Sequence, residues 1–215
     1  MSGLFIVLEG PEGAGKSTVA QQLAGWLREQ LAAHGSSARK VVLTKEPGGT
    51  PVGDAIRSVL LDPGQQIAPL TEFLLFSASR AQHVQDVIRP ALEQGDAVIC
   101  DRFTASSVAY QGAGRGLDQK LVSCLNRTVS QQLQPDLTVL LDIDAGMGLS
   151  RIAARGEADR LEQADPAFHA RVQASFREQA RQGDWLVVDA AQPQQLVFEQ
   201  VTAGLHDRLG RWFSA

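Results

Sequence analysis

Hydrophobic residues in this chain gather in five short runs, which alternate with longer stretches of mixed polar and apolar character. The runs are Leu4–Leu8, Val41–Thr44, Ala97–Cys100, Leu137–Leu141 and Trp185–Val188. They show no alternation of apolar and polar positions, which is typical of strands buried on both faces of a parallel sheet. The pattern therefore predicts an α/β fold with a five-stranded parallel sheet flanked by helices on both faces.

The stretches between these runs repeat apolar residues at three- and four-residue spacing, which predicts amphipathic helices. Clear examples are Val52–Leu61, a long stretch over 69–93 in one or two pieces, and Ala145–Arg155. Three further helices are expected on the apolar positions Leu121, Leu125, Val129 and Leu133, then Phe168, Val172 and Phe176, and finally Val197, Val201, Leu205 and Leu209. Gly112–Gly116 contains three glycines and is predicted to be a surface loop.

A glycine-rich segment, Gly10–Ser17, follows the first predicted strand directly and precedes a predicted helix. It reads G-P-E-G-A-G-K-S and matches the phosphate-binding pattern G-x-x-x-x-G-K-[ST] in the structural order that this motif requires. Main-chain N–H groups and the helix dipole favour an anion here. Lys16 is expected to reach the β- and γ-phosphates of a nucleoside triphosphate, and the Ser17 hydroxyl is expected to bind Mg²⁺.

Glu12 places a negative charge inside this predicted anion site. One interpretation is an acidic side chain at a solvent-facing loop tip. The other is a partner for a cation, either Mg²⁺ or an arginine from elsewhere in the chain.

Composition narrows the function further. The 215 residues carry a net charge of −4, with 44% hydrophobic and 20% charged residues, which are values of a globular domain and argue against a general nucleic-acid-binding protein. Two cysteines, Cys100 and Cys124, are too few for a zinc site or a disulfide framework and are expected to be buried thiols. No apolar run reaches membrane-spanning length, and the early phosphate-binding motif leaves no room for a signal peptide. We expect one cytoplasmic domain over 1–215, with a mobile insert at about 153–165.

Further candidate residues lie near the predicted carboxyl ends of the strands, where ligands gather in parallel sheets. Asp101 and Arg102 follow the third strand, where they would serve either as turn residues or as ligands of a metal and a second anion.

Phe76 and Arg80 are one helical turn apart and suit a nucleobase, although a core ring with a surface arginine is the simpler interpretation. Arg151, Arg155 and Arg160 cluster at the predicted insert, either as a solvated basic face or as groups that close on a phosphoryl group.

Five segments together resemble the bacterial thymidylate kinase family, and the resemblance spans the whole chain. They are Glu9–Ser17, Glu46–Thr50, Phe76–Arg80, Asp101–Phe103 and the most specific one, Tyr110–Gly116, which reads Y-Q-G-x-G-R-G. An acidic residue in the phosphate-binding loop and an arginine in the lid are similar to one subgroup of this family, which pairs Glu12 with Arg155. The chain departs from other members at Phe103 and Ser107, so contacts there are left open.

The resemblance implies a nucleoside monophosphate kinase with a P-loop NTPase fold and a short lid, which transfers the γ-phosphoryl group of ATP to dTMP in dTTP synthesis. It implies catalytic roles for Lys16, Glu12, Asp101, Arg102 and Arg155, and Mg²⁺ binding by Ser17 and Asp101. It implies ATP binding by Gly10, Pro11, Glu12, Gly13, Ala14, Gly15, Lys16, Ser17, Thr18, Arg151 and Gln192. It implies dTMP binding by Glu46, Pro47, Arg57, Phe76, Arg80, Arg102, Ser107, Tyr110 and Gln111.

Two other functions remain open at this stage. A deoxynucleoside kinase would share the phosphate-binding loop and an Asp-Arg pair, and a nucleotide-dependent switch module would hydrolyse ATP slowly and act through a partner. The resemblance also implies a homodimer, although no single stretch visibly encodes it, and it implies neither a nucleic acid nor a membrane as a partner.

Overall fold

A computed structural model of the chain describes residues 3–34, 38–156 and 158–213. Its centre is a five-stranded sheet with the order β2-β3-β1-β4-β5 and only parallel pairings. The strands are β1 (Leu4–Glu9), β2 (Val41–Lys45), β3 (Ala97–Asp101), β4 (Leu137–Asp142) and β5 (Leu186–Asp189). The predicted five-stranded parallel sheet is therefore confirmed, with each strand within one or two residues of its predicted bounds.

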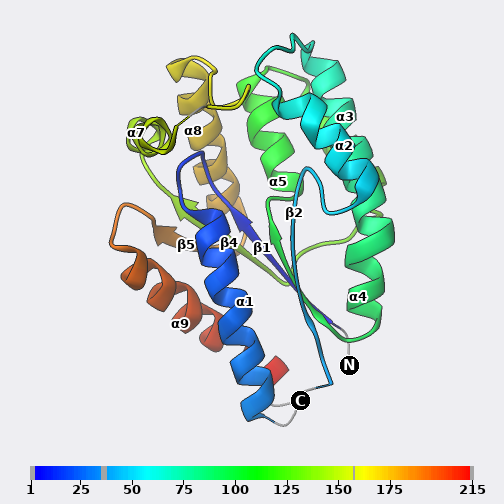
Figure 1. Ribbon diagram of the computed structural model, residues 1–215, viewed down its shortest axis with the longest axis vertical. Helices are drawn as coiled ribbons and strands as arrows, with labels where there is room; N and C mark the ends of the chain where they lie inside the picture. The colour runs from blue at the N-terminus through cyan, green and yellow to red at the C-terminus, as the bar shows by residue number, and fades with distance from the viewer. Residues whose placement is uncertain (1–2, 35–37, 157, 214–215) are drawn as a thin grey trace.

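Helices connect successive strands and cover both faces of the sheet (Figure 1). They are α1 (Lys16–Ala33), α2 (Pro51–Leu61), α3 (Pro69–His83), α4 (Arg89–Glu93), α5 (Thr104–Ser107), α6 (Gln119–Val129), α7 (Ala145–Arg155), α8 (Pro166–Gln182) and α9 (Gln194–Phe213). Two π-helical segments, η1 (Val84–Ile88) and η2 (Val108–Gly114), also belong to the fold. The predicted helical stretch over 69–93 is continuous and consists of α3, η1 and α4.

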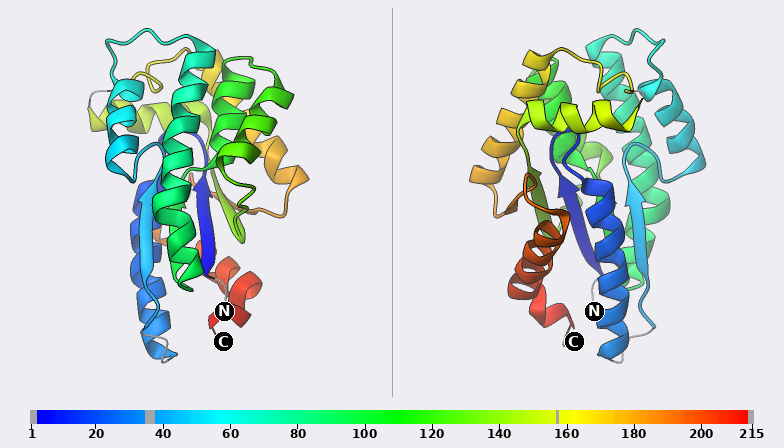
Figure 2. Two further views of the ribbon diagram at one scale, coloured as in Figure 1. Left: turned by 90° about the vertical axis from the view of Figure 1, so that its right-hand side faces the viewer. Right: turned by 60° about the vertical axis from the view of Figure 1, so that its left-hand side comes forward.

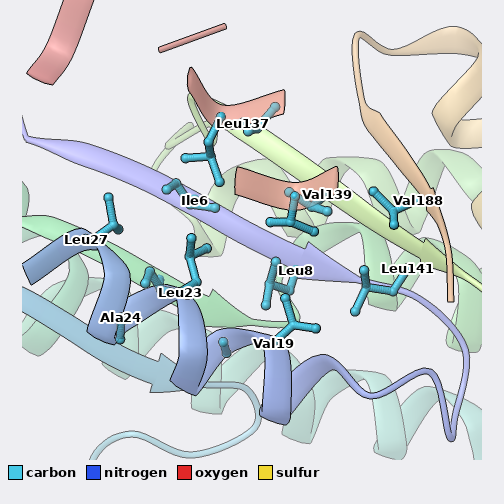
Figure 3. Packing of buried hydrophobic residues seen from close by; sticks show 14 of the residues in the cluster. Ile6, Leu8, Val19, Leu23, Ala24, Leu27, Leu137, Val139, Leu141 and Val188 are labelled. Carbon is cyan, nitrogen blue, oxygen red and sulfur yellow. The ribbon is translucent and has the colours of Figure 1, made fainter. Parts of the chain in front are cut away.

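Alternate residues of the strands face two separate cores. Ile6 and Leu8 of β1 pack with Leu23 of α1 and with α9 on one face (Figure 3), whereas Phe5 and Val7 pack on the opposite face with η1 and α4. A third cluster joins Leu140 of β4 to α8 and η2. Burial on both faces explains why the strands read as unbroken apolar runs.

The carboxyl ends of the strands all point to one edge of the sheet, where α2, α7 and the segment before α8 gather (Figure 2). Asp165 caps α8 by accepting a hydrogen bond of 2.8 Å from the Phe168 N–H, as the Asp165-Pro166 pair predicts. Within the described part of the chain, no helix has the length and apolar character needed to cross a membrane.

The prediction of a surface loop at Gly112–Gly116 was wrong for its first half, because Gly112 and Gly114 lie buried within η2. A Cβ at Gly114 would lie 2.6 Å from the Phe168 ring, so this glycine allows η2 to approach α8 closely. Glycine content alone cannot distinguish such a close helix contact from an exposed turn.

The predicted inner face of α6 was wrong at Leu121, whereas Leu125 and Val129 are half-buried. Leu121 is 43% exposed, and the buried positions are Val122 and Asn126, one residue further along. A polar asparagine occupies this face because it binds the side chain of Arg80, so the hydrophobic pattern is shifted. Of the two cysteines, Cys100 is buried as expected, but Cys124 is exposed.

Candidate functional site

A cavity of about 330 Å³ opens at the carboxyl edge of the sheet. It brings together the phosphate-binding loop, the ends of β2 and β3, parts of α2 and α3, the segment from α5 to η2, the end of α7 and the segment 159–162. Residues from the sequence predictions that line it are Glu12, Gly13, Gly15, Lys16, Ser17, Thr18, Glu46, Pro47, Arg57, Phe76, Arg80, Asp101, Arg102, Ser107, Tyr110, Gln111 and Arg155. Gly10, Pro11 and Ala14 of the same loop are buried and do not line the cavity.

The phosphate-binding loop needs glycine at Gly13 for two reasons. Its φ of 72° is left-handed, and a Cβ there would lie 2.2 Å from the carbonyl oxygen of Gly148 in α7. A Cβ on Gly148 would likewise lie 2.3 Å from the carbonyl oxygen of Glu12. The loop and α7 therefore meet backbone to backbone, a contact that the sequence pattern did not reveal.

Lys16 begins α1 and lies folded over the loop. Its Nζ donates hydrogen bonds of 2.7 Å to the Pro11 carbonyl and 3.1 Å to the Gly10 carbonyl. Burial and the nearby charge of Arg102 lower the pKa of Lys16 to about 8. Among the described residues, these two carbonyls are the hydrogen-bond acceptors of the ammonium group, and an incoming anion can compete for it.

Glu12 and Arg102 form an ion pair in the cavity, with 2.7 Å between Glu12 Oε1 and Arg102 Nη2. The Tyr110 hydroxyl donates to the same carboxylate oxygen at 2.8 Å and accepts from Arg102 at 3.0 Å. Burial opposes ionisation of Glu12, but the charges of Arg102 and Lys16 outweigh it and lower its pKa to about 2. The Glu12 carboxylate also raises the pKa of Arg102 against the effect of burial.

The prediction that Glu12 pairs with the lid arginine Arg155 was wrong in this structure. Its arginine partner comes instead from the end of β3. Arg155 has a 65% exposed side chain and lies 2.5 Å from Glu162. In the sequence, Arg102 and Arg155 both lie next to predicted loop segments. The spacing alone therefore does not indicate which of the two meets Glu12.

Arg102 owes its position to an unusual backbone and to a buried carboxylate. Its φ of 74° lies in the left-handed region, which costs about 1 kcal/mol or more for a residue other than glycine. Glu9, which is fully buried, accepts hydrogen bonds from the Phe103 N–H at 2.9 Å and the Ser106 hydroxyl at 2.6 Å. Burial raises the pKa of Glu9. Ser106 in turn accepts from Arg102 at 3.2 Å, so Glu9 supports the guanidinium indirectly.

Ser17 and Asp101, the two predicted metal ligands, lie side by side. The Ser17 hydroxyl donates to Asp101 Oδ2 at 2.6 Å. Both side chains line the cavity next to Lys16. Paired hard oxygen atoms beside a phosphate-binding loop suit Mg²⁺, which takes one or two protein oxygens and completes its shell with phosphates and water.

Arg80 is held from four sides and is almost completely buried. It donates to Glu46 Oε2 at 2.7 Å, Asn126 Oδ1 at 2.8 Å, Ser107 Oγ at 3.0 Å and the Phe103 carbonyl at 3.0 Å. The simpler interpretation of a surface arginine is therefore wrong. Glu46 additionally contacts His83, with 3.1 Å between Oε1 and Nδ1.

Phe76 lies one turn before Arg80 on α3, and its half-buried ring lines the cavity. Arg57 of α2 also lines the cavity and donates to the Pro47 carbonyl at 2.9 Å. The cavity therefore offers an aromatic face, a buried guanidinium and a second, less buried arginine within one space.

The lid segment folds back on itself through Glu162. This carboxylate accepts from Arg155 and, at 2.9 Å, from the Asp159 N–H. Burial and the neighbouring Glu162 raise the pKa of Asp159. Residue 157 of the predicted insert lies outside the described residues.

Arg151 and Gln192, the residues expected near an adenine, do not line the cavity. Arg151 donates to the Gly13 carbonyl at 3.3 Å and to the Ala190 carbonyl at 3.0 Å, so it lies on the outer side of the phosphate-binding loop. Gln192 accepts from Gln200 at 3.1 Å. Arg151 thus contacts Ala190, which directly follows β5, and Gln192 lies two residues further along the chain.

Sequence reasoning missed several residues of the cavity. Those that line it are Lys45, Leu61, Ser106, Asp159, Leu161 and Glu162. It also missed two buried carboxylates beneath it, Glu9 and Glu72. A signal was present for Glu72, because a carboxylate on the buried side of α3 requires cationic partners.

Comparisons with known proteins agree on one family. The family model described as thymidylate kinase matches residues 8–201. A thymidylate kinase of Deinococcus radiodurans is 50% identical over 208 residues, which cover 96% of this chain and 98% of that protein. One from Thermosynechococcus vestitus is 46% identical and covers 99% of this chain and 90% of its own length.

A solved structure is similar as well. The crystal structure of thymidylate kinase from Ehrlichia chaffeensis superposes with a TM-score of 0.75 at 32% identity. The similarity covers 95% of this chain and 99% of that one.

Proposed function

Because the chain belongs to the thymidylate kinase family, we propose that its cavity binds ATP and dTMP together and aligns them for phosphoryl transfer. As a nucleoside monophosphate kinase of the P-loop NTPase fold, it transfers the γ-phosphoryl group of ATP to dTMP and yields dTDP and ADP, in dTTP synthesis. The observation that carries the assignment of the site is the single cavity that joins Lys16 and Ser17 to Phe76, Arg80 and Arg102.

The phosphate-binding loop is the donor half of this site. Its main-chain N–H groups and Lys16 would bind the ATP phosphates, since the hydrogen-bond partners of Lys16 among the described residues are carbonyl oxygens. Arg151 and Gln192 flank the outer side of the loop and would lie beside the adenine. Their separation from the cavity agrees with a nucleobase that extends away from the reacting phosphates.

The acceptor half lies between α3 and η2. Phe76 would stack on the thymine ring, and Arg80 would donate to its edge. Arg102 and Arg57 would hold the dTMP phosphate, and the buried Tyr110 would contact the sugar. Glu46 and Ser107 hold Arg80 in place and so act through it.

Mg²⁺ would bind at Ser17 and Asp101, whose oxygens lie 2.6 Å apart at the donor end of the cavity. Within the described residues, no group of three or more acidic, histidine or cysteine side chains could hold a metal, as is usual where phosphates supply most ligands. When bound, the ion would neutralise charge on the phosphates.

The protein itself contributes alignment and positive charge. A phosphate monoester is largely dianionic at neutral pH, so the dTMP oxygen needs no general base to become a nucleophile. Lys16, Arg102 and, after lid closure, Arg155 would stabilise the charge that spreads over the transferring group. Glu12 would keep Arg102 oriented until the acceptor phosphate arrives.

The segment 153–165 is proposed as the lid of a single kinase domain over 1–215, and closure would exclude water that otherwise hydrolyses ATP.

A symmetric homodimer is proposed to form through α3 and α6, which pack against each other. Leu70, Leu74 and Leu121 on these helices are 46%, 50% and 43% exposed, so both helices present apolar side chains that a second copy could cover. Light scattering of the wild type and of Leu74→Glu tests this, and we expect the variant to be a monomer.

The cytoplasm is the proposed location, since ATP and dTMP are available there.

The decisive test is a panel of nucleoside monophosphates with ATP and Mg²⁺, read by ADP release. We expect dTMP to be phosphorylated far faster than other monophosphates. Turnover of thymidine without turnover of dTMP would support a deoxynucleoside kinase instead. ATP hydrolysis that dTMP does not stimulate would support a switch module.

A further inference from the structure

Glu72 is a fully buried carboxylate on α3 that three separate segments share. It accepts hydrogen bonds from Gln111 Nε2 at 3.0 Å, from Arg115 Nε at 3.2 Å and Nη2 at 3.0 Å, and from Arg160 Nη1 at 2.6 Å. Gln111 lies in η2, Arg115 follows it, and Arg160 belongs to the lid segment. One side chain thus connects the acceptor half of the cavity to the lid.

The first consequence concerns the orientation of the Gln111 amide. An ionised carboxylate only accepts hydrogen bonds, so the amide must direct its NH₂ group toward Glu72. Its carbonyl oxygen then faces the other way, and no donor among the described residues bonds to it. Because Gln111 lines the cavity, this oxygen offers an acceptor to a bound nucleobase. An acceptor suits thymine, whose N3 carries hydrogen, and disfavours cytosine, whose N3 has only a lone pair.

The second consequence concerns the lid. Arg160 donates from Nε to the Leu60 carbonyl at 2.7 Å, and its backbone N–H donates to the Leu61 carbonyl at 3.2 Å. These bonds attach the lid segment to the end of α2. Glu72 supplies the negative charge for the Arg160 guanidinium, whose side chain is 9% exposed. Asp159 and Glu162, which organise Arg155, are neighbours of this anchor in the chain.

We propose that Glu72 is a positioning residue that couples base selection to lid attachment. Its carboxylate fixes the amide of Gln111 on one side and anchors the lid through Arg160 on the other. The base-selection half rests on the proposed acceptor site. The lid half does not, since its contacts lie within the protein alone.

The experiment compares three variants of the full chain. Glu72→Gln keeps the size of the side chain but lets its new NH₂ group face Gln111, which must then turn its own NH₂ group into the cavity. Arg160→Met removes the lid anchor and leaves the Gln111–Glu72 contact in place. Asp142→Asn is the matched control, because it breaks a carboxylate–arginine pair with Arg177 at 2.8 Å that lies outside the cavity.

Two quantities are measured for each variant. One is the ratio of kcat/KM for dTMP to that for dCMP, since loss of a site's hydrogen-bond match to one base changes this ratio. The other is hydrogen–deuterium exchange of a peptide that covers 158–164, without nucleotide. For Glu72→Gln we expect the ratio to fall by about tenfold or more and lid exchange to rise by about tenfold. For Arg160→Met we expect faster lid exchange with the ratio unchanged.

The test is whether the variants change the base ratio and the lid exchange separately. An unchanged base ratio in Glu72→Gln overturns the role in selection, and unchanged lid exchange in Arg160→Met overturns the role in the lid, even where Glu72→Gln does not fold. Equal effects in Asp142→Asn would show that any lost ion pair has the same result and would also overturn the proposal. If the wild-type protein does not phosphorylate dTMP, the proposed function fails, whereas the lid exchange still reports on Glu72.

Discussion

Arg102 Nη2 lies 2.7 Å from Glu12 Oε1, although the two residues are 90 positions apart in the chain. The pair joins the phosphate-binding loop to the end of β3, and Tyr110 bonds to both members. The acidic side chain in the anion site therefore has a cation already in place. It restrains the guanidinium that is proposed to hold the acceptor phosphate.

Arg102→Met should weaken dTMP binding by about 30-fold or more, because loss of a buried charge-assisted contact costs about 2–5 kcal/mol. ATP binding should change far less. Isothermal titration calorimetry with each nucleotide measures both affinities. Equal losses for dTMP and ATP would contradict the assignment of Arg102 to the acceptor.

The Glu12–Arg102 pair itself is tested by a double-mutant cycle. Glu12→Gln alone should leave dTMP affinity equal or slightly higher, since the carboxylate competes with the phosphate for Arg102, while kcat falls by about tenfold. Groups in direct contact usually show a coupling energy of about 0.5–3 kcal/mol. The cycle is closed with Arg102→Met and the double variant, read by kcat/KM for dTMP. Additive effects would mean that the two residues act independently.

Lys16 should make ATP binding depend on pH. Its pKa of about 8 lies below the ordinary value of 10.5, because burial and Arg102 disfavour the charged form. Polyphosphate binding favours the ammonium form, so ATP affinity should fall by up to tenfold per pH unit as pH rises above about 8. Fluorescence titration between pH 7 and 10 measures this, and Lys16→Arg, which stays protonated, should flatten the profile.

The same pKa sets the sign of a stability effect. Since the folded pKa lies below the unfolded one, charged Lys16 costs stability at low pH, and this cost disappears as pH rises from about 8 toward 10.5. The stability of the wild type relative to Lys16→Met should therefore increase over this range.

Lys16→Ala should also lower kcat by about 100-fold while dTMP binding remains nearly intact.

Arg80 should contribute more to stability than a surface arginine. Its side chain is 2% exposed and paired with Glu46, so Arg80→Ala leaves a buried carboxylate without its cation, which costs about 3–5 kcal/mol. Arg177→Ala is the comparison, because that side chain is 47% exposed and its ion pair is worth about 1 kcal/mol or less. Urea unfolding measures both. A loss below about 1 kcal/mol for Arg80→Ala would contradict a structural role.

The sequence revealed the fold because both kinds of element carry local patterns. Val98 and Ile99 of β3 face opposite cores, so neither position could be polar, and the strand reads as an apolar run. Asp165-Pro166 and the loop from Gly10 to Ser17 are signals that depend on near neighbours alone. Such local patterns do not depend on contacts with distant parts of the chain.

The ion pairs within the site could not be predicted from local sequence patterns. The sequence does not indicate which acidic residue pairs with each arginine of the site. The packing of β3, α7 and the lid decides which carboxylate is met by Arg102, Arg155 and Arg160. Asn126 illustrates the same limit, since its burial follows from the position of Arg80 rather than from its own hydrophobicity.

Phe76 provides a test of base stacking that is separate from the charged network. Its ring is half-buried and lines the cavity, and among the described residues its side chain takes part in no hydrogen bond or ion pair. Stacking of a base on an aromatic side chain is worth about 1–3 kcal/mol, so Phe76→Ala should weaken dTMP binding by about 5- to 150-fold. Phe76→Tyr keeps the ring and should bind dTMP nearly as the wild type does. Calorimetry gives the affinities, and thermal unfolding shows whether the fold is retained. Equal weakening by both substitutions would argue that the cavity wall, rather than the aromatic face, recognises the base.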